Sequence, residues 1–190
     1  MKTLFKKARD FVISFYWKFR IHLGLKKNWT VWKRIQIGNH KTIQSLKNAI
    51  YLNGCEIETS AGTILATMPL RTSIDSLDLV LVTPAELGIS KPSTYQDIIR
   101  AGCERGLKLN PAEAAIQLRL QYTDQQVGQR LHMAMDAIDI YRVPLILTLE
   151  HFAPTGNWYD GACLLTSSVD AQRQPIHYFS KTDLFIFAKL

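Results

Sequence analysis

The sequence has few cysteines and lacks the short motifs that mark the common catalytic sites. Its three cysteines, Cys55, Cys103 and Cys163, are odd in number and far apart, with no CxxC or Cys/His ligand spacing. This pattern argues against a disulfide framework and against a zinc site, and it suits a reducing cytoplasm. GxSxG, P-loop, GxGxxG, HExxH and paired-carboxylate motifs are also missing. We therefore expect no bound metal and no cofactor.

The chain also lacks a long apolar run. The stretch FVISFYW covers residues 11–17 and is well short of the roughly 20 apolar residues that span a bilayer. Lys18 and Arg20 follow this stretch at the place where a secretory signal carries small residues for cleavage. Neither a transmembrane helix nor a signal peptide is predicted.

Acidic residues are scarce at the N-terminus. Residues 1–34 hold ten Lys or Arg and the single acid Asp10, a net charge of +9, so the remaining residues sum to −2. The chain has 190 residues, 47% of them hydrophobic and 21% charged, which is enough for one domain with a real core. We expect a basic amphipathic helix and linker over residues 1–28 and a single domain over residues 29–190.

On a helical wheel, the apolar residues of the N-terminal segment fall within an arc of about 140°, with cations at both rims. The face contains Leu4, Phe5, Ala8, Phe11, Val12, Phe15, Tyr16, Phe19 and Leu23, and the rims are Lys7, Lys18, Arg9 and Arg20. A helix of this kind lies in a lipid interface while its Lys and Arg side chains reach toward anionic headgroups. The same face is also typical of a helix that packs on its own domain or on a second copy of the chain. Nucleic acid is a weaker match, because rings that stack on bases alternate with cations and here the two are segregated.

The stretch LKLNPAEAAIQLRLQY, residues 107–122, has the clearest local pattern of the chain. Asn110 is a good N-cap residue, a proline follows it at the first helical position, and Glu113 can bond back to the Asn110 amide. A helix is therefore predicted to start there. Its apolar residues spread over one broad face that also contains Arg119, where a guanidinium needs a partner because an unpaired buried charge is costly.

A second interpretation of the same stretch remains open. The helix can end near Gln117, with LRLQY (residues 118–122) alternating as a strand that sends Arg119 to solvent.

Apolar periodicity and turn residues predict the other elements. Strands are expected at residues 31–37, 77–82, 130–137, 145–152 and 184–190, and helices at residues 40–53, 57–68 and 93–104, with loops or a hairpin at residues 153–181. The predicted fold class is α+β: a single domain with helices mostly in the first half and an antiparallel β-meander in the second, preceded by the N-terminal basic amphipathic helix.

Three stretches carry a resemblance to other proteins. They are VWKRIQIG (residues 31–38), LDLVLVTPAELG (residues 77–88) and GLKLNPAEAAIQLRLQYTDQ (residues 106–125). From about Val31 onward the chain resembles a set of short, uncharacterised bacterial proteins that share a VWKxIxxG … PAE…LRLQYxDQ pattern. The resemblance implies a common fold unit and no known activity, and it marks residues 1–30 as an addition. Those proteins usually have a Cys before PAE where this chain has Asn110, which removes that thiol as a candidate nucleophile.

The best candidate polar site consists of Glu113, Arg119, Tyr122 and Gln125, because these residues cluster in one element and the helical interpretation places the Arg119 cation on the core-facing side. Each also has a structural interpretation. Helix capping accounts for Glu113, and packing or turn hydrogen bonds account for Tyr122 and Gln125.

A separate candidate is His132, which lies beside Arg130 on the polar side of its predicted strand. It could form an acid/base pair with Glu150 or His151 on a neighbouring strand. The structural alternative is a histidine that faces solvent.

The leading functional hypothesis is a non-enzymatic interaction module in the cytoplasm, attached peripherally to the inner membrane face by residues 4–23. Its expected partner is an anionic membrane surface, or a partner protein that binds the same residues. One alternative is an enzyme of unknown reaction, in which Arg119 holds an anionic substrate and Glu113 or His132 is the acid/base. The other is a nucleic-acid-binding accessory protein that uses the basic segment.

Overall fold

The computed structural model describes residues 28–153, 161–169 and 178–189. Within them the chain forms four helices and nine strands. The helices are α2 (Ile43–Leu52), α3 (Thr59–Thr67), α4 (Tyr95–Glu104) and α5 (Glu113–Gln121). The strands are β1 (Lys33–Ile37), β2 (Glu56–Ile57), β3 (Asp75–Val82), β4 (Leu107–Lys108), β5 (Arg130–Met133), β6 (Ile138–Ile140), β7 (Val143–Phe152), β8 (Gly161–Ser168) and β9 (Leu184–Lys189). The amphipathic helix and lipid-facing residues predicted for the N-terminal segment lie outside the described residues.

All nine strands belong to one curled, mixed sheet with the order β1-β3-β9-β5-β7-β8-β2. Off this path, β4 pairs with β9 and β6 pairs with β7. Most pairs are antiparallel, but β5 runs parallel to β9 and β2 runs parallel to β8. The described residues therefore form a single α+β fold, as predicted. The predicted antiparallel meander is not confirmed, because β9 lies between β3 and β5 and breaks the sequential order.

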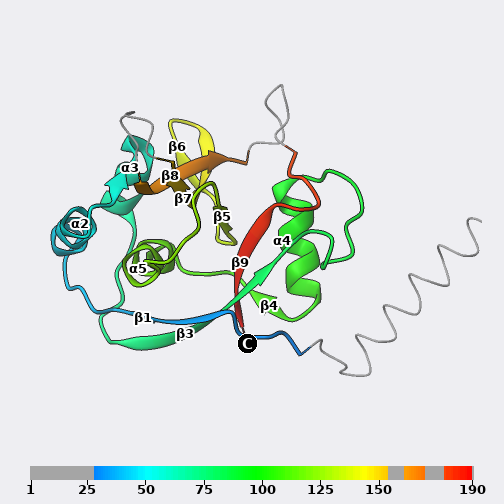
Figure 1. Ribbon diagram of the computed structural model, residues 1–190, viewed down its shortest axis with the longest axis horizontal. Coiled ribbons are helices and arrows are strands. Elements are labelled where there is room, and N and C mark those ends of the chain that lie inside the picture. The colour runs from blue at the N-terminus through cyan, green and yellow to red at the C-terminus, as the bar shows by residue number, and fades with distance from the viewer. Residues whose placement is uncertain (1–27, 154–160, 170–177, 190) are drawn as a thin grey trace, which may run out of the picture.

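Helix α5 is the element around which the sheet curls. Figure 1 shows it inside the curve, with β1 and β3 below it, β7 and β8 above it and α2 alongside. Seven consecutive residues, Glu113 to Arg119, are buried. This part of the helix has no solvent face, so its polar residues have partners inside the fold.

Helix α4 covers the other face of the central strands, and Figure 1 shows β9 between α4 and α5. Gly102 permits this close packing, since a Cβ at that position would lie 2.4 Å from the ring of Phe187. On the same side, the Tyr95 hydroxyl donates to the backbone oxygen of Met135 at 2.7 Å and accepts from its amide at 2.9 Å. These contacts hold α4 against the end of β5.

The boundaries of the early helices agree with the local signals. Thr42 caps α2, and α3 ends before Pro69. The cap of α4 is Thr94, whose hydroxyl accepts from the Asp97 amide at 3.3 Å, one residue after the predicted helix start at residue 93. None of the helices within the described ranges is long and apolar enough to cross a membrane.

The open choice at residues 118–122 is resolved as helix, since α5 runs to Gln121 and Tyr122 is its C-cap. The predicted start of α5 is wrong. Asn110 does not cap it: the helix begins at Glu113 after Ala112, which makes no side-chain cap hydrogen bond. Instead, the Asn110 side-chain amide donates to the backbone oxygens of Ala134 (3.2 Å) and Ile186 (2.7 Å). The Asn110 backbone amide also donates to the Ala134 oxygen at 2.7 Å, so the whole residue is held against the strands and its side chain is not available to cap α5.

Two predictions in the second half also change. The strand expected at residues 130–137 is shorter, because β5 ends at Met133 and β6 follows only at Ile138. Within the region expected to hold loops or a hairpin, β8 pairs antiparallel with β7 from Gly161 to Ser168.

Candidate functional site

Glu113 is a buried carboxylate that joins two distant loops to α5. Its Oε1 accepts from the Gly38 amide at 2.7 Å, and its Oε2 accepts from the Arg71 amide at 2.8 Å. Gln117 donates to the same Oε1 at 3.2 Å. The side chain is only 1% exposed, so the carboxylate is satisfied by groups inside the fold. The predicted bond back to Asn110 is therefore wrong, and no free Glu113 oxygen faces solvent as an acid/base would need.

Gly38 makes this contact possible. Its φ is +80°, and a Cβ there would lie 2.1 Å from the backbone oxygen of Ser73. A side chain at residue 38 would therefore push apart the two loops that Glu113 holds together.

The same face of α5 closes the outer edge of β1. The side chain of Gln121 accepts from the Gln36 amide at 2.9 Å and donates to the Gln36 oxygen at 2.8 Å. The side-chain amide of Gln121 thus makes the two backbone hydrogen bonds that a neighbouring strand would make at Gln36. An edge strand such as β1 is where a sheet is prone to unwanted pairing with another chain.

Arg119 is a buried cation held by neutral groups. Its two terminal nitrogens donate to Gln125 Oε1 and to the backbone oxygen of Tyr122. The side chain is 2% exposed, and Nε has no hydrogen-bond partner among the described residues. No carboxylate of those residues lies within 4.0 Å of it. Burial accordingly lowers the pKa of the guanidinium.

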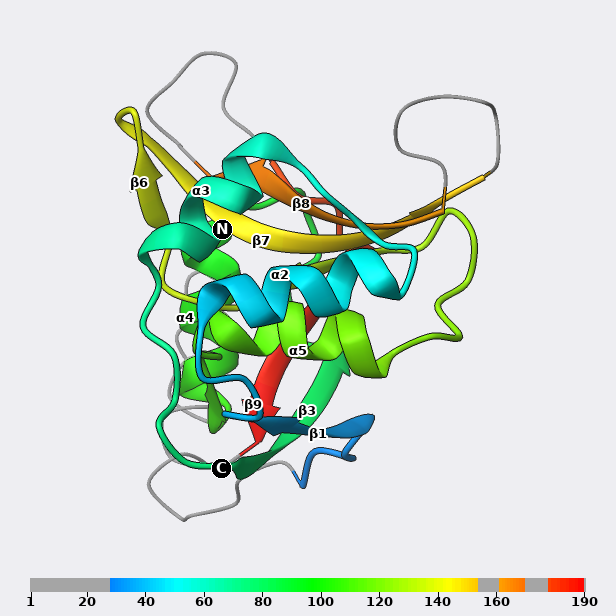
Figure 2. The same ribbon diagram turned by 90° about the vertical axis from the view of Figure 1, so that its left-hand side faces the viewer.

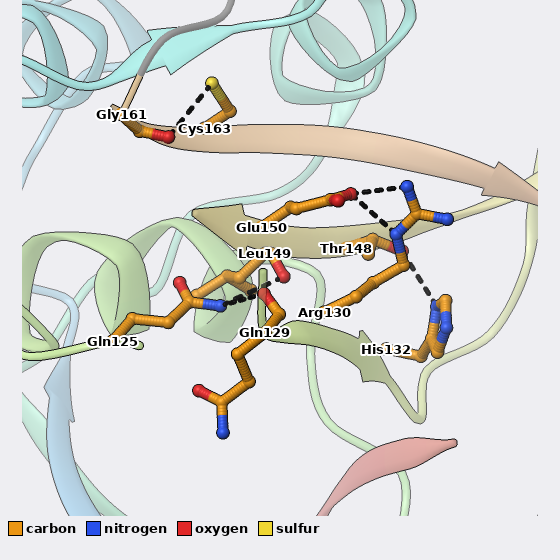
Figure 3. Close-up of polar contacts among 9 residues, drawn as sticks. All are labelled: Gln125, Gln129, Arg130, His132, Thr148, Leu149, Glu150, Gly161 and Cys163. Atoms are coloured by element: carbon orange, nitrogen blue, oxygen red, sulfur yellow. Dashed lines mark hydrogen bonds and ion pairs between the residues drawn. The ribbon is translucent and has the colours of Figure 1, made fainter. Parts of the chain in front are cut away.

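Gln125 extends this network to the sheet. Its side-chain nitrogen donates to the backbone oxygens of Gln129 (2.8 Å) and Leu149 (3.3 Å), as Figure 3 shows. Tyr122 donates from its hydroxyl to Gln129 Oε1 at 3.1 Å. The structure therefore brings three of the four predicted polar-site residues together, Arg119, Tyr122 and Gln125. Glu113, at the other end of α5, makes its contacts elsewhere.

Two cysteines that the sequence gave no reason to group lie near Arg119. Cys55 directly precedes β2, and its neighbour Glu56 pairs with Cys163 on β8. Burial raises the pKa of both thiols, that of Cys163 to about 11, while the Arg119 charge acts in the opposite direction on both. Both are therefore thiols at neutral pH rather than activated nucleophiles. Their sequence spacing gave no signal, because a parallel pairing between distant strands brings them together.

His132 is neither solvent-facing nor paired with Glu150 or His151. It is 5% exposed, and its ring packs against Phe179 and Phe185 with centroid distances of 5.0 and 5.3 Å. Its Nδ1 lies 3.2 Å from the hydroxyl of Thr148, the residue opposite it on β7. The alternation of residues along the strand placed His132 on the same face as Arg130, but the ring of Phe179 covers His132 there.

The other polar groups on this part of the sheet pair among themselves. Arg130 Nε donates to Glu150 Oε2 at 2.6 Å, beside the His132 and Thr148 pair (Figure 3). The Nδ1 of His151 lies 2.6 Å from the backbone oxygen of Gln125. Among the described residues, no group of three His, Cys, Asp or Glu side chains could hold a metal ion. The side chains of Arg130, Glu150 and His151 thus all make contacts within the described fold.

The chain matches no protein-family model, no curated protein and no solved structure. The resemblance to short bacterial proteins with the PAE…LRLQYxDQ pattern therefore stays a prediction.

Proposed function

We propose that the protein is a non-enzymatic interaction module that attaches peripherally to an anionic membrane surface through residues 4–23. The observation that carries this proposal is the separation of charge along the chain. Residues 1–28 hold eight Lys or Arg against one acid, whereas residues 29–190 hold fifteen against fifteen. The whole net charge of +7 therefore belongs to the segment that also carries the apolar face. The cytoplasmic side of the inner membrane, with its anionic lipids, is the proposed location.

The non-enzymatic part of the proposal is supported by the contacts of the candidate catalytic groups. Glu113 accepts from two backbone amides, Arg119 is enclosed by neutral acceptors, and His132 lies between aromatic rings. An enzyme that held an anion with Arg119 would first have to break these contacts. The enzymatic alternative is therefore the weaker one.

Two single substitutions test the membrane proposal. Phe15→Asp places a negative charge on the apolar face, whereas Ser14→Asp adds the same charge on the polar side of the predicted helix. Binding of the full chain to vesicles that contain phosphatidylserine is measured by co-sedimentation. Phe15→Asp is expected to weaken binding about a hundredfold, because it removes a ring worth roughly 2–3 kcal/mol when buried. Ser14→Asp is expected to weaken it only about fivefold, since one charge near such a surface contributes on the order of 1 kcal/mol.

Equal effects of the two substitutions would mean that charge alone drives the association, and would overturn insertion of the apolar face. Absence of pelleting by the unmodified chain would overturn the membrane proposal as a whole. Binding of single-stranded nucleic acid with a steep salt dependence would then favour the accessory-protein alternative.

A further inference from the structure

Trp29 fixes the place where the N-terminal segment leaves the folded body. Its indole Nε1 donates to the backbone oxygen of Arg105 at 3.0 Å, across 76 residues of sequence. The side chain is buried and belongs to the hydrophobic core. The exposed residues Asn28 and Thr30 flank it. The chain is therefore tied to the turn between α4 and β4, and the segment before it cannot leave the body from anywhere else.

The link between this anchor and the predicted membrane helix is short. Leu23 is the last residue of the predicted apolar face, so six residue steps separate it from Trp29. Fully extended, they span at most about 21 Å. A body of residues 29–190 is about 40 Å across. A link of half that length does not let the body turn its far side toward the lipid.

The surface around the anchor carries more cations than acids. Lys108 is exposed on β4, where it lies opposite Ala188 of β9, while Lys189 lies opposite Leu107 and so points to the other face of this strand pair. Arg105 lies on the turn just before β4 and is half-buried, and its guanidinium donates to the backbone oxygen of Ala101 at 3.0 Å. Glu104 adds one negative charge there, while Asp78 on the neighbouring strand already pairs with Arg34 at 2.5 Å.

The opposite end of the body is the hairpin between β6 and β7. Figures 1 and 2 place it at the top of the molecule, with β1 and the C-terminal end of β9 at the bottom. Its tip consists of Tyr141 and Arg142, and Tyr141 is 90% exposed. The hairpin tip therefore offers a reference position on the same chain, far from the anchor.

From this arrangement we infer that the body itself meets the anionic lipid at the end where Trp29 anchors the chain, through the exposed side chain of Lys108. The inference rests on the proposed function, since it takes residues 4–23 to be the membrane attachment. The partner is a phospholipid surface, and the chemistry of recognition is lysine and arginine side chains on headgroup phosphates and carboxylates. The hairpin at β6 and β7 then points away from the membrane and stays open to other contacts.

Site-specific labels test the orientation in the full chain. Cys103, the exposed native thiol among the three cysteines, is first changed by Cys103→Ser. A fluorophore is then attached to Thr30→Cys or to Tyr141→Cys, and each protein is bound to phosphatidylserine vesicles that carry a nitroxide on some headgroups. The label at residue 30 is expected to be quenched and the label at residue 141 to stay bright.

Pelleting with equal quenching of both labels, or stronger quenching at residue 141, overturns the inferred orientation and leaves the proposed attachment intact. Failure of the labelled chains to pellet overturns both. These outcomes keep the two ideas distinguishable.

A matched pair of charge changes tests the contact itself. Lys108→Gln and Arg142→Gln each remove one positive charge, at opposite ends of the body. Lys108→Gln is expected to lower the vesicle partition coefficient about fivefold, whereas Arg142→Gln leaves it unchanged. Equal effects of the two changes would overturn the lysine contact.

Discussion

Cys163 has a thiol whose protonation is tied to folding. It is fully buried on β8, and burial raises the pKa of the thiol from its ordinary value of 9.0 to about 11. The Glu56 charge acts in the same direction, and the Arg119 charge partly offsets it. Because the pKa is higher in the folded state, the native protein keeps a proton there that the unfolded chain releases above pH 9. The thiol therefore stabilises the fold fully below pH 9 and progressively less as the pH rises toward 11.

The free energy of unfolding is expected to fall between pH 9 and pH 11, with Cys163 contributing about 1.4 kcal/mol per pH unit. Cys163→Ala is expected to make this fall shallower by that amount. Chemical denaturation at a series of pH values measures it. Thr166→Ala on the same strand is the control, because it changes no titrating group and lowers the stability equally at every pH. A Cys163→Ala variant with an unchanged pH slope would contradict the role of this thiol.

At the scale of elements, local sequence patterns were enough to locate the start of a helix where the hydrogen-bond partner of the capping residue lies within one helical turn. Thr42 and Thr94 cap the helices that follow them, and the helix starts predicted at residues 40 and 93 lie within two residues of these caps. Asn110 and Glu113 show the same local pattern, yet both turned to backbone groups more than 20 residues away. The pattern failed there because α5 is enclosed by the sheet, so the side chains at its start contact neighbouring strands and loops instead of the amides of their own helix. The burial of His132 was unpredictable for a similar reason, since Phe179 lies 47 positions away in sequence.

A substitution of Glu113 tests whether α5 is enclosed by the sheet. Glu113→Gln exchanges one carboxylate oxygen for an amide NH2, so that either Gly38 or Arg71 loses the acceptor of its backbone N–H. Because hydrogen bonds to a buried charged group are worth roughly 1.5–3 kcal/mol, a loss of about 2 kcal/mol in unfolding free energy is expected. Urea denaturation measures it.

The control is Glu86→Gln, which makes the same chemical change at an exposed turn. Glu86 Oε2 accepts from the Thr83 amide at 2.8 Å. Water can replace that contact, so the cost should stay below about 1 kcal/mol. Similar losses for the two variants would show that the carboxylate of Glu113 is not held in an enclosed site.

At the scale of the whole molecule, the central position of β9 ties folding to the end of the described chain. The strand pairs with β3 on one side and with β5 and β4 on the other, so it joins segments from three parts of the sequence. Periodicity identified β9 as a strand but carries no information on its neighbours, which is why the sequence predicted a sequential meander. Pairings of such large sequence separation pay their loop-closure cost before they gain contacts, and they fold slowly.

Removal of residues 184–190 is therefore expected to abolish cooperative unfolding, because β3 and β5 would each lose a neighbour and α4 would lose Phe187, against which Gly102 packs. Removal of residues 1–27 is the matched truncation at the other end. Trp29 and every described contact are retained there, so the shortened chain should keep a single sigmoidal transition. Urea titrations followed by circular dichroism compare the two forms.

A cooperative transition in the chain without β9 would mean that the remaining strands form a core alone. Loss of cooperativity without residues 1–27 would place the N-terminal aromatic face in the core of the body, and the membrane attachment would then have no free apolar surface to use.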